Sequence, residues 1–225
     1  MCRRAHRWKK HDLETYIRIN IKSQDVFTHP SESYLIFEGR LTNAAGTAYA
    51  NADEAALTNN AIMHLFSRIE YHLSNQLIES LSYSGRATTM LGMLKYPDKF
   101  SKAQGLNQLW YKYTSTTAAK ADNNGFAARH AHLIQSLTVK GIFRFIIQLK
   151  HIFGFCEDYN KIVYGLKRSL TLVMKTGDDA IFRGATAGAG KVSLDKFHGS
   201  CPTLFRLMPK SFPFTRLLNQ KLSYR

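Results

Sequence analysis

The chain has 225 residues, of which 44% are hydrophobic and 12% are aromatic, so it is long and apolar enough to fold around a core. This composition excludes wholesale disorder. The formal net charge is +15, but ten of the 31 Lys and Arg residues lie in residues 1–10 and 197–225, which carry no acid. Because the rest holds 21 basic and 16 acidic side chains, a nucleic-acid function argued from charge depends on the two ends.

The chain carries no pattern typical of export or membrane insertion. Residues 1–11 are basic and have no apolar segment behind them, so we expect a disordered arm and no secretory signal. The longest apolar run, residues 142–149, is interrupted by polar side chains and is too short to span a bilayer. The cysteines Cys2, Cys156 and Cys201 are far apart, so we expect neither a disulfide framework nor a structural zinc site. An intracellular protein, in cytoplasm or nucleus, is therefore expected.

Alternation of apolar and polar residues predicts strands in the first third of the chain. Residues 16–21 and 34–42 are the first two predicted strands, and residues 25–33 form a loop between them. Residues 43–47 are typical of a turn. Residues 48–59 are small and polar, so we expect them to form a connection over the surface.

The clearest pattern in the sequence is a predicted β-hairpin within residues 60–81. Ile69, Tyr71 and Leu73 alternate with polar residues, so they share one face of a strand. Residues 74–76 are turn-prone, and an extended pattern resumes after them. Because an isolated hairpin is marginally stable in water, other strands must cover it.

A short helix follows, and then more strands. Residues 88–96 have apolar side chains at helical spacing before Pro97 ends the pattern. Those apolar side chains are Met90, Leu91, Met93 and Leu94. The remaining predicted strands are 141–149, 162–174, 180–183 and 191–195. The whole pattern, about eight antiparallel strands with one or two short helices, predicts an all-β sandwich or barrel. It lacks the regular βαβ alternation of Rossmann-type and TIM-type enzymes.

Candidate sites for chemistry are few and fail on spacing. The glycine-rich stretch 184–192 is not a phosphate-binding loop, because Ala185 stands where the first glycine belongs and Val192 replaces the magnesium-binding hydroxyl. A flexible link is the better interpretation. His130 and His132 would share one face of a strand, but no third ligand sits at a suitable distance, so we expect a solvated pair.

The remaining reactive residues also have structural interpretations. Cys156 precedes Glu157 and Asp158, whose charge would raise the pKa of a thiol, so we interpret it as a small buried residue. The histidines in apolar surroundings are interpreted in the same way: they are His64, His72 and His151. We therefore expect no enzyme, no catalytic, cofactor-binding or metal-binding residues, and no cofactor.

Two aromatic and cationic stretches invite a nucleic-acid interpretation. Residues 111–113 (Tyr-Lys-Tyr) and 143–145 (Phe-Arg-Phe) alternate rings with positive charge, as in proteins that stack single-stranded bases. Half-buried strands with a polar outer face are the more ordinary explanation. A basic β-sheet module that binds nucleic acid through these strands and the two tails stays open as the alternative function.

The order of the motifs resembles one known family. A Leu65-Phe66 dipeptide leads into the hairpin, the short helix follows, and residues 149–155 (Leu-Lys-His-Ile-Phe-Gly-Phe) precede the last long strand. This order resembles the double jelly-roll major capsid proteins of polinton-type mobile elements and adintoviruses, including copies integrated in animal genomes. The resemblance covers residues 12–196 and corresponds to the first of the two jelly rolls.

The resemblance implies a structural function. Such proteins associate with themselves into trimers of pseudo-hexagonal outline that tile an icosahedral virion shell, with no small-molecule substrate and no catalysis. The second jelly roll of the family would begin where this chain ends, so we expect a truncated or domesticated, genome-integrated copy, and a doubtful trimer. A carbohydrate-binding or cupin-like enzyme is a third possibility for a jelly roll, but it needs a trio of metal ligands that the sequence does not offer.

Residues 197–225 depart from the family pattern. They hold no acid and no clear period, so we expect an irregular basic tail. Read one base earlier, codons that fit residues 197–204 would encode Ile-Ser-Trp-Phe-Met-Pro-His-Val, the run that the family has at this place. We therefore hypothesise that residues 197–225 are a frameshifted remnant, in which case their charge is accidental and nucleic acid is bound only weakly.

Overall fold

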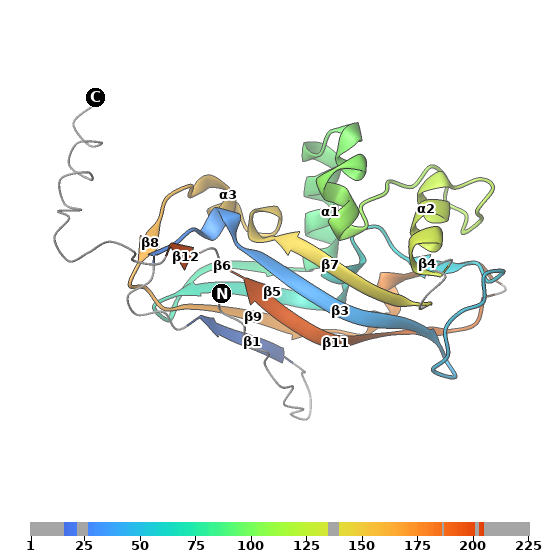
Figure 1. Cartoon of the computed structure of the whole chain (residues 1–225), viewed down its shortest axis with the longest axis horizontal. Helices are drawn as coiled ribbons and strands as arrows, with labels where there is room; N and C mark the ends of the chain where they lie inside the picture. Colours follow the sequence, from blue (N-terminus) through green and yellow to red (C-terminus); the bar gives the residue numbers. More distant parts are fainter. Residues whose placement is uncertain (1–15, 22–26, 135–139, 186, 201–202, 205–225) are drawn as a thin grey trace.

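A computed structural model describes residues 16–21, 27–134, 140–185, 187–200 and 203–204, and the predicted arm 1–11 lies outside these ranges. Two antiparallel sheets form the body of the protein (Figure 1). In spatial order, one consists of β11 (Gly190–Ser200), β3 (Tyr34–Asn43) and β7 (Ile142–Gln148). The other consists of β1 (Tyr16–Ile21), β9 (Arg168–Met174), β5 (Phe66–Leu73) and β6 (Gln76–Ser82).

Short strands and helices complete the architecture. Two small sheets pair β10 (Ile181–Arg183) with β4 (Ala55–Leu57), and β12 (Thr203–Leu204) with β2 (Phe27–Thr28) and β8 (Val163–Tyr164). The α-helices are α1 (Ser84–Lys95), α2 (Asn124–Leu133) and α3 (Gly154–Asp158). The 3-10 helices are η1 (Pro30–Glu32), η2 (Ala61–Leu65), η3 (Asp98–Lys102), η4 (Gln104–Gln108), η5 (Leu149–His151) and η6 (Gly177–Ala180).

The core lies between the two main sheets, because each presents one apolar face to the other. From β3 and β7 the inward side chains are Leu35, Phe37, Leu41, Phe143, Phe145 and Ile147. From the opposite sheet they are Ile17, Ile19, Ile69, Tyr71, Leu170 and Leu172. The ring of Phe37 lies 5.8 Å from that of Phe66 on β5, so aromatic contacts join the layers. The predicted all-β sandwich is confirmed.

The predicted hairpin is confirmed as β5 and β6. These strands pair from Arg68–Ser82 to Leu73–Gln76. The two residues between them, Ser74 and Asn75, have φ of 48° and 69°, the left-handed values of a type I′ turn. That turn twists in the same sense as the strands, which explains why turn-prone residues here give a tight hairpin.

The expectation of a surface connection at residues 48–59 is wrong for its second half, although residues 48 and 50–52 are exposed. Within this segment β4 is fully buried, since Ala55, Ala56 and Leu57 are each 0% exposed. The strand pairs with β10 and lies against α2. The two alanines of β4 are small, so β4, β10 and α2 can lie close together. The same small residues made the segment look like a loop in the sequence.

The predicted strand over residues 162–174 is interrupted. Only Val163 and Tyr164 form β8, and Gly165 then takes a φ of 68° before β9 begins. Glycine adopts this left-handed value without steric cost, so the chain turns there. As a result Leu166, assigned to the strand from its spacing, is 41% exposed.

The helices are more numerous than the one or two expected. Residues 88–96 were predicted to be helical, and α1 begins four residues earlier at Ser84. Within the described ranges there are three α-helices and twelve strands, and five of the strands are only two or three residues long. Elements of that length leave no measurable periodicity, which is why the sequence undercounts them.

Strand β11 crosses the predicted domain boundary between Lys196 and Phe197. It pairs with β3 as far as Ser200, opposite Tyr34. Phe197 is 7% exposed, and its ring lies 4.7 Å from that of Phe37. The expectation of an irregular tail is therefore wrong for residues 197–200. A residue read in a shifted frame has no reason to fit a core in register, so this packing argues against a frameshift at residue 197.

Candidate self-association surface

Helix α1 presents its apolar side chains to solvent. The side chains that it buries are small or polar: Ser84, Gly85, Thr88 and Gly92. The exposed fractions of its large apolar side chains are 67% for Met90, 47% for Leu91, 48% for Met93 and 86% for Leu94. This distribution is the reverse of the usual arrangement for a helix that packs on a globular core.

The inner face of α1 is small because the helix lies very close to the body. A Cβ atom added at Gly85 would lie 2.5 Å from the His64 ring, and one added at Gly92 would lie 2.4 Å from the Trp110 ring. Hydrogen bonds fix the same face. Ser84 donates to the carbonyl of Phe66 at 2.8 Å, and the amide of Asn60 donates to the Thr88 hydroxyl at 2.7 Å.

The C-terminal end of α1 is held equally firmly. Lys95 forms an ion pair with Glu157 of α3. Tyr96 stacks on Phe100 at 3.9 Å, and His151 lies 5.3 Å from the Tyr96 ring. Burial and the nearby Glu157 raise the pKa of Tyr96 to about 12. Burial, with Lys150 nearby, lowers the pKa of His151 to about 4, so the imidazole is neutral. With both ends packed, α1 is a fixed platform.

The exposed apolar face continues beyond the helix. Tyr83, immediately before α1, is 71% exposed, and Leu77 and Ile78 of the preceding strand β6 are 46% and 39% exposed. From its exposed fractions, the α1 part with Tyr83 covers on the order of 500 Å², within the range that marks interaction sites on soluble proteins. We call this set (Tyr83, Met90, Leu91, Met93 and Leu94) the α1 face.

Positive charge borders the α1 face. Arg86 lies in the first turn of the helix, and Lys99 and Lys102 lie in η3 directly after it. These three side chains form no ion pair with any residue in the described ranges. The nearby acid Asp98 is already paired with Lys112 at 3.3 Å. The face can therefore bury apolar area and accept negative charge at its border.

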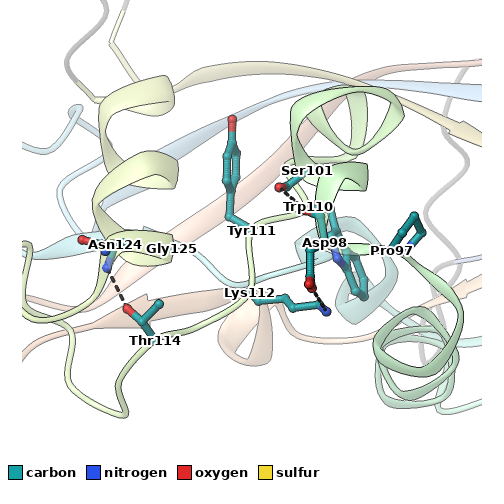
Figure 2. Close-up of a pocket in the computed structure, with 9 residues that line it drawn as sticks. All are labelled: Pro97, Asp98, Ser101, Trp110, Tyr111, Lys112, Thr114, Asn124 and Gly125. Atoms are coloured by element: carbon teal, nitrogen blue, oxygen red, sulfur yellow. Dashed lines mark hydrogen bonds and ion pairs between the residues drawn. The ribbon is translucent and has the colours of Figure 1, made fainter.

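A pocket lies beside the C-terminal end of α1 (Figure 2). It has a volume of about 240 Å³, with Trp110 and Tyr111 among its lining residues. The Asp98–Lys112 ion pair crosses its lining. A volume near 240 Å³ lies below the usual range for small-molecule sites, and its charged groups satisfy each other, so we assign it no ligand.

The structure separates the two histidines that the sequence pairs. Both lie on helix α2, not on a strand. His130 is 0% exposed and its Nε2 lies 2.9 Å from the carbonyl oxygen of Asp53, whereas His132 is exposed. Residues two apart on a helix point in different directions, so the pair cannot bind one metal ion. Across the described residues, no three His, Cys, Asp or Glu side chains gather as metal ligands.

The other sequence candidates have structural positions. Cys156 is fully buried in α3, as the sequence predicted. Phe143 and Phe145 are 3% and 1% exposed, so these rings fill the core and cannot stack on bases. The glycine-rich link joins β10 to β11, and Val192 lies within β11. None of the helices in the described part of the chain is long and apolar enough to cross a membrane.

One buried charge was not foreseen. Arg129 of α2 is 0% exposed. Its Nε donates to the carbonyl of Leu57 at 3.0 Å, another nitrogen donates to the carbonyl of Tyr111, and its guanidinium lies 4.3 Å from the centre of the Tyr113 ring. Burial lowers its pKa to about 10. The arginine therefore ties α2 to β4 and to the segment after η4, and no sequence signal distinguishes it from a surface residue.

Comparison with known proteins places the fold. A family model described as a double jelly roll-like domain matches residues 55–207, more than half of the chain. This chain belongs to that family. The predicted jelly-roll fold is therefore confirmed. The match runs eleven residues beyond Lys196, so β11 and β12 both lie entirely within the double jelly roll-like region. No curated protein matches the chain.

Proposed function

We propose that this double jelly roll-like protein is a structural, self-associating subunit of a capsid-type shell, of the kind found in polinton-type elements and adintoviruses, and that it has no enzymatic activity. The observation that carries the proposal is the match to the double jelly roll-like domain, a fold typical of structural capsid proteins. The α1 face supports it, because a rigidly held apolar surface is what a subunit contact requires.

The arrangement of reactive groups agrees with a structural function. His130 and Cys156 are buried, and His130 is turned toward a backbone carbonyl. The Asp98–Lys112 pair at the pocket is neutralised internally.

The main partner in this proposal is the protein itself, as a trimer by resemblance to the family. Nucleic acid is contacted only weakly, through the basic segments 1–11 and 205–225. The proposed location is the cytoplasm or nucleus, or the virion for a shell-forming protein.

The test is the mass of the purified full-length chain in solution, measured by sedimentation velocity across a hundredfold range of concentration. We expect mass to rise with concentration, with trimers or larger closed assemblies visible by negative-stain electron microscopy. A chain that stays monomeric at every concentration and in both low and physiological salt would contradict the proposal.

A further inference from the structure

We propose that the α1 face is a two-fold contact between copies of this chain, in which the α1 helices of two copies pack antiparallel through Met90 and Leu94. This inference rests on the proposed self-association and adds a second contact to it, one that joins subunits of neighbouring trimers and does not build the trimer itself. A two-fold contact is isologous, so the same residues must be complementary to themselves.

The exposed side of α1 has a spacing of residues that suits antiparallel packing against a second copy. Arg86, Met90 and Leu94 recur every four residues and therefore lie along one side of the helix. Twelve residues give a helix of about 18 Å, and Met90 lies close to its middle. If the two-fold axis passes at Met90, then Met90 meets its own copy and Arg86 of each chain lies beside Leu94 of the other.

Charge decides between antiparallel and parallel packing. Arg86 lies in the first helical turn, which contains no acid, so its positive charge opposes the positive end of the helix dipole. An antiparallel copy brings the carbonyl groups at the C-terminal end of its α1 toward Arg86, and these carry the negative end of the helix dipole. Parallel packing would instead set Arg86 against Arg86.

The area suits a weak contact. Two copies of the α1 face would bury about 1,000 Å² together, the lower limit for a specific interface. Such a contact is weak between isolated subunits, and it gains strength when several act together in one assembly. Because one chain supplies both the apolar area and the complementary charges, a second copy is the occupant that the observations favour over a membrane surface or an acidic peptide.

Cysteine cross-linking tests the geometry in the full-length chain. In a background with Cys2→Ser and Cys201→Ser, Met90→Cys is expected to form a disulfide-linked dimer under mild oxidation. Ile162→Cys, at a position that is 45% exposed and outside the α1 face, is the control. Mixed Arg86→Cys and Leu94→Cys chains are expected to link to each other more than to themselves. Equal dimer yields from Met90→Cys and the control, or self-linking of both mixed chains, would overturn the antiparallel contact.

Sedimentation equilibrium tests the energetics. Leu91→Glu and Ile162→Glu replace side chains of nearly equal exposure, 47% and 45%. We expect Leu91→Glu to weaken association at least tenfold and Ile162→Glu to leave it unchanged. If the wild type associates and Leu91→Glu does so equally, the α1 contact is wrong while the proposed function stands. If the wild type never associates, both fail.

Binding of a membrane to the α1 face would be detected by a separate experiment. Vesicles of phosphatidylcholine with one-third phosphatidylserine are the probe, with flotation as the readout. We expect the wild-type chain to stay unbound in physiological salt. Wild-type flotation that Leu91→Glu abolishes and Ile162→Glu retains would assign the α1 face to lipid and overturn the proposal.

Discussion

Helices α1 and α2 lie on the same side of the sandwich (Figure 1) but use their residues in opposite ways. Helix α2 buries Phe126 and Leu133, both 0% exposed, and even an arginine. Helix α1 buries glycine, serine and threonine and leaves Met90 and Leu94 in water. Helix α2 therefore fills the core with its large apolar side chains, whereas the large apolar side chains of α1 are left exposed.

The comparison shows that a helix can pack closely on the body of the protein without burying its large apolar side chains. Helix α1 approaches the body more closely than a helix with large inner side chains could. Ser84 donates a hydrogen bond to the carbonyl of Met63, and Thr88 accepts one from the amide of Asn60, so the helix is held there. Its apolar residues are thereby free for another surface. We therefore expect substitutions on α2 to alter folding, and substitutions on the outer side of α1 to alter association.

The largest effect is expected from Phe126→Ala in α2. The ring is fully buried and packs against Phe182 and His130. Removing it leaves a cavity, so the free energy of unfolding should fall by about 3–5 kcal/mol, measured by urea unfolding. Met90→Ala on α1 is the matched control. A similar loss from both changes would erase the contrast between the helices.

Acid should loosen the C-terminal end of α1. The pKa of His151 is about 4 in the folded chain and about 6.5 in the unfolded chain. Between these values the unfolded chain binds a proton that the folded chain does not, so stability falls as the pH falls from 6.5 toward 4.

The contribution of His151 is about 3 kcal/mol across that range. Urea unfolding at several pH values should show a shallower dependence for His151→Gln than for the wild type. An identical dependence would show that His151 does not titrate as its buried position requires.

Asn123 is the cap of α2, and its loss should cost about 2 kcal/mol. Its side chain accepts from the Phe126 amide at 3.0 Å and donates to the carbonyls of Ser115 and Thr117. Asn124→Ala removes the same chemical group at an exposed position. The urea midpoint should fall for Asn123→Ala and stay unchanged for Asn124→Ala. Equal midpoints for the two variants would show that the Asn123 cap does not contribute to stability.

Gly85→Ala should destabilise the chain by about 1–2 kcal/mol, although alanine favours helices. The added methyl group would meet the ring and backbone of His64. Gly188→Ala is the control, because nothing lies within 4 Å of a Cβ there. A gain in thermal midpoint for Gly85→Ala would mean that α1 is not closely seated.

Leu94→Ser should have the smallest effect on folding. Leu94 is 86% exposed, so its replacement should change the free energy of unfolding by no more than about 0.5 kcal/mol. Urea unfolding at a protein concentration too low for association isolates this term. A loss of several kcal/mol would place Leu94 inside the fold of the single chain.

The sequence predicts the strands that have one buried face and fails elsewhere for physical reasons. Residues 16–21 and 34–42 alternate because one side meets the core, and both predictions are confirmed. Strand β4 is buried throughout and three residues long, so it shows no alternation. The pattern locates the apolar residues of α1, but a single chain cannot tell whether they pack inward or toward another molecule. Arg129 resembles any helical surface residue until its carbonyl partners are seen.

Strand β11 has a consequence for synthesis on the ribosome. Its pairing with β3 joins residues as distant as Tyr34 and Ser200, which are 166 positions apart. During translation, β3 therefore cannot pair with β11 until residues 190–200 have left the ribosome. In that interval the β3 edge and the ring of Phe37 are open to wrong pairing with other nascent chains. We expect this long-range pairing to make folding slow.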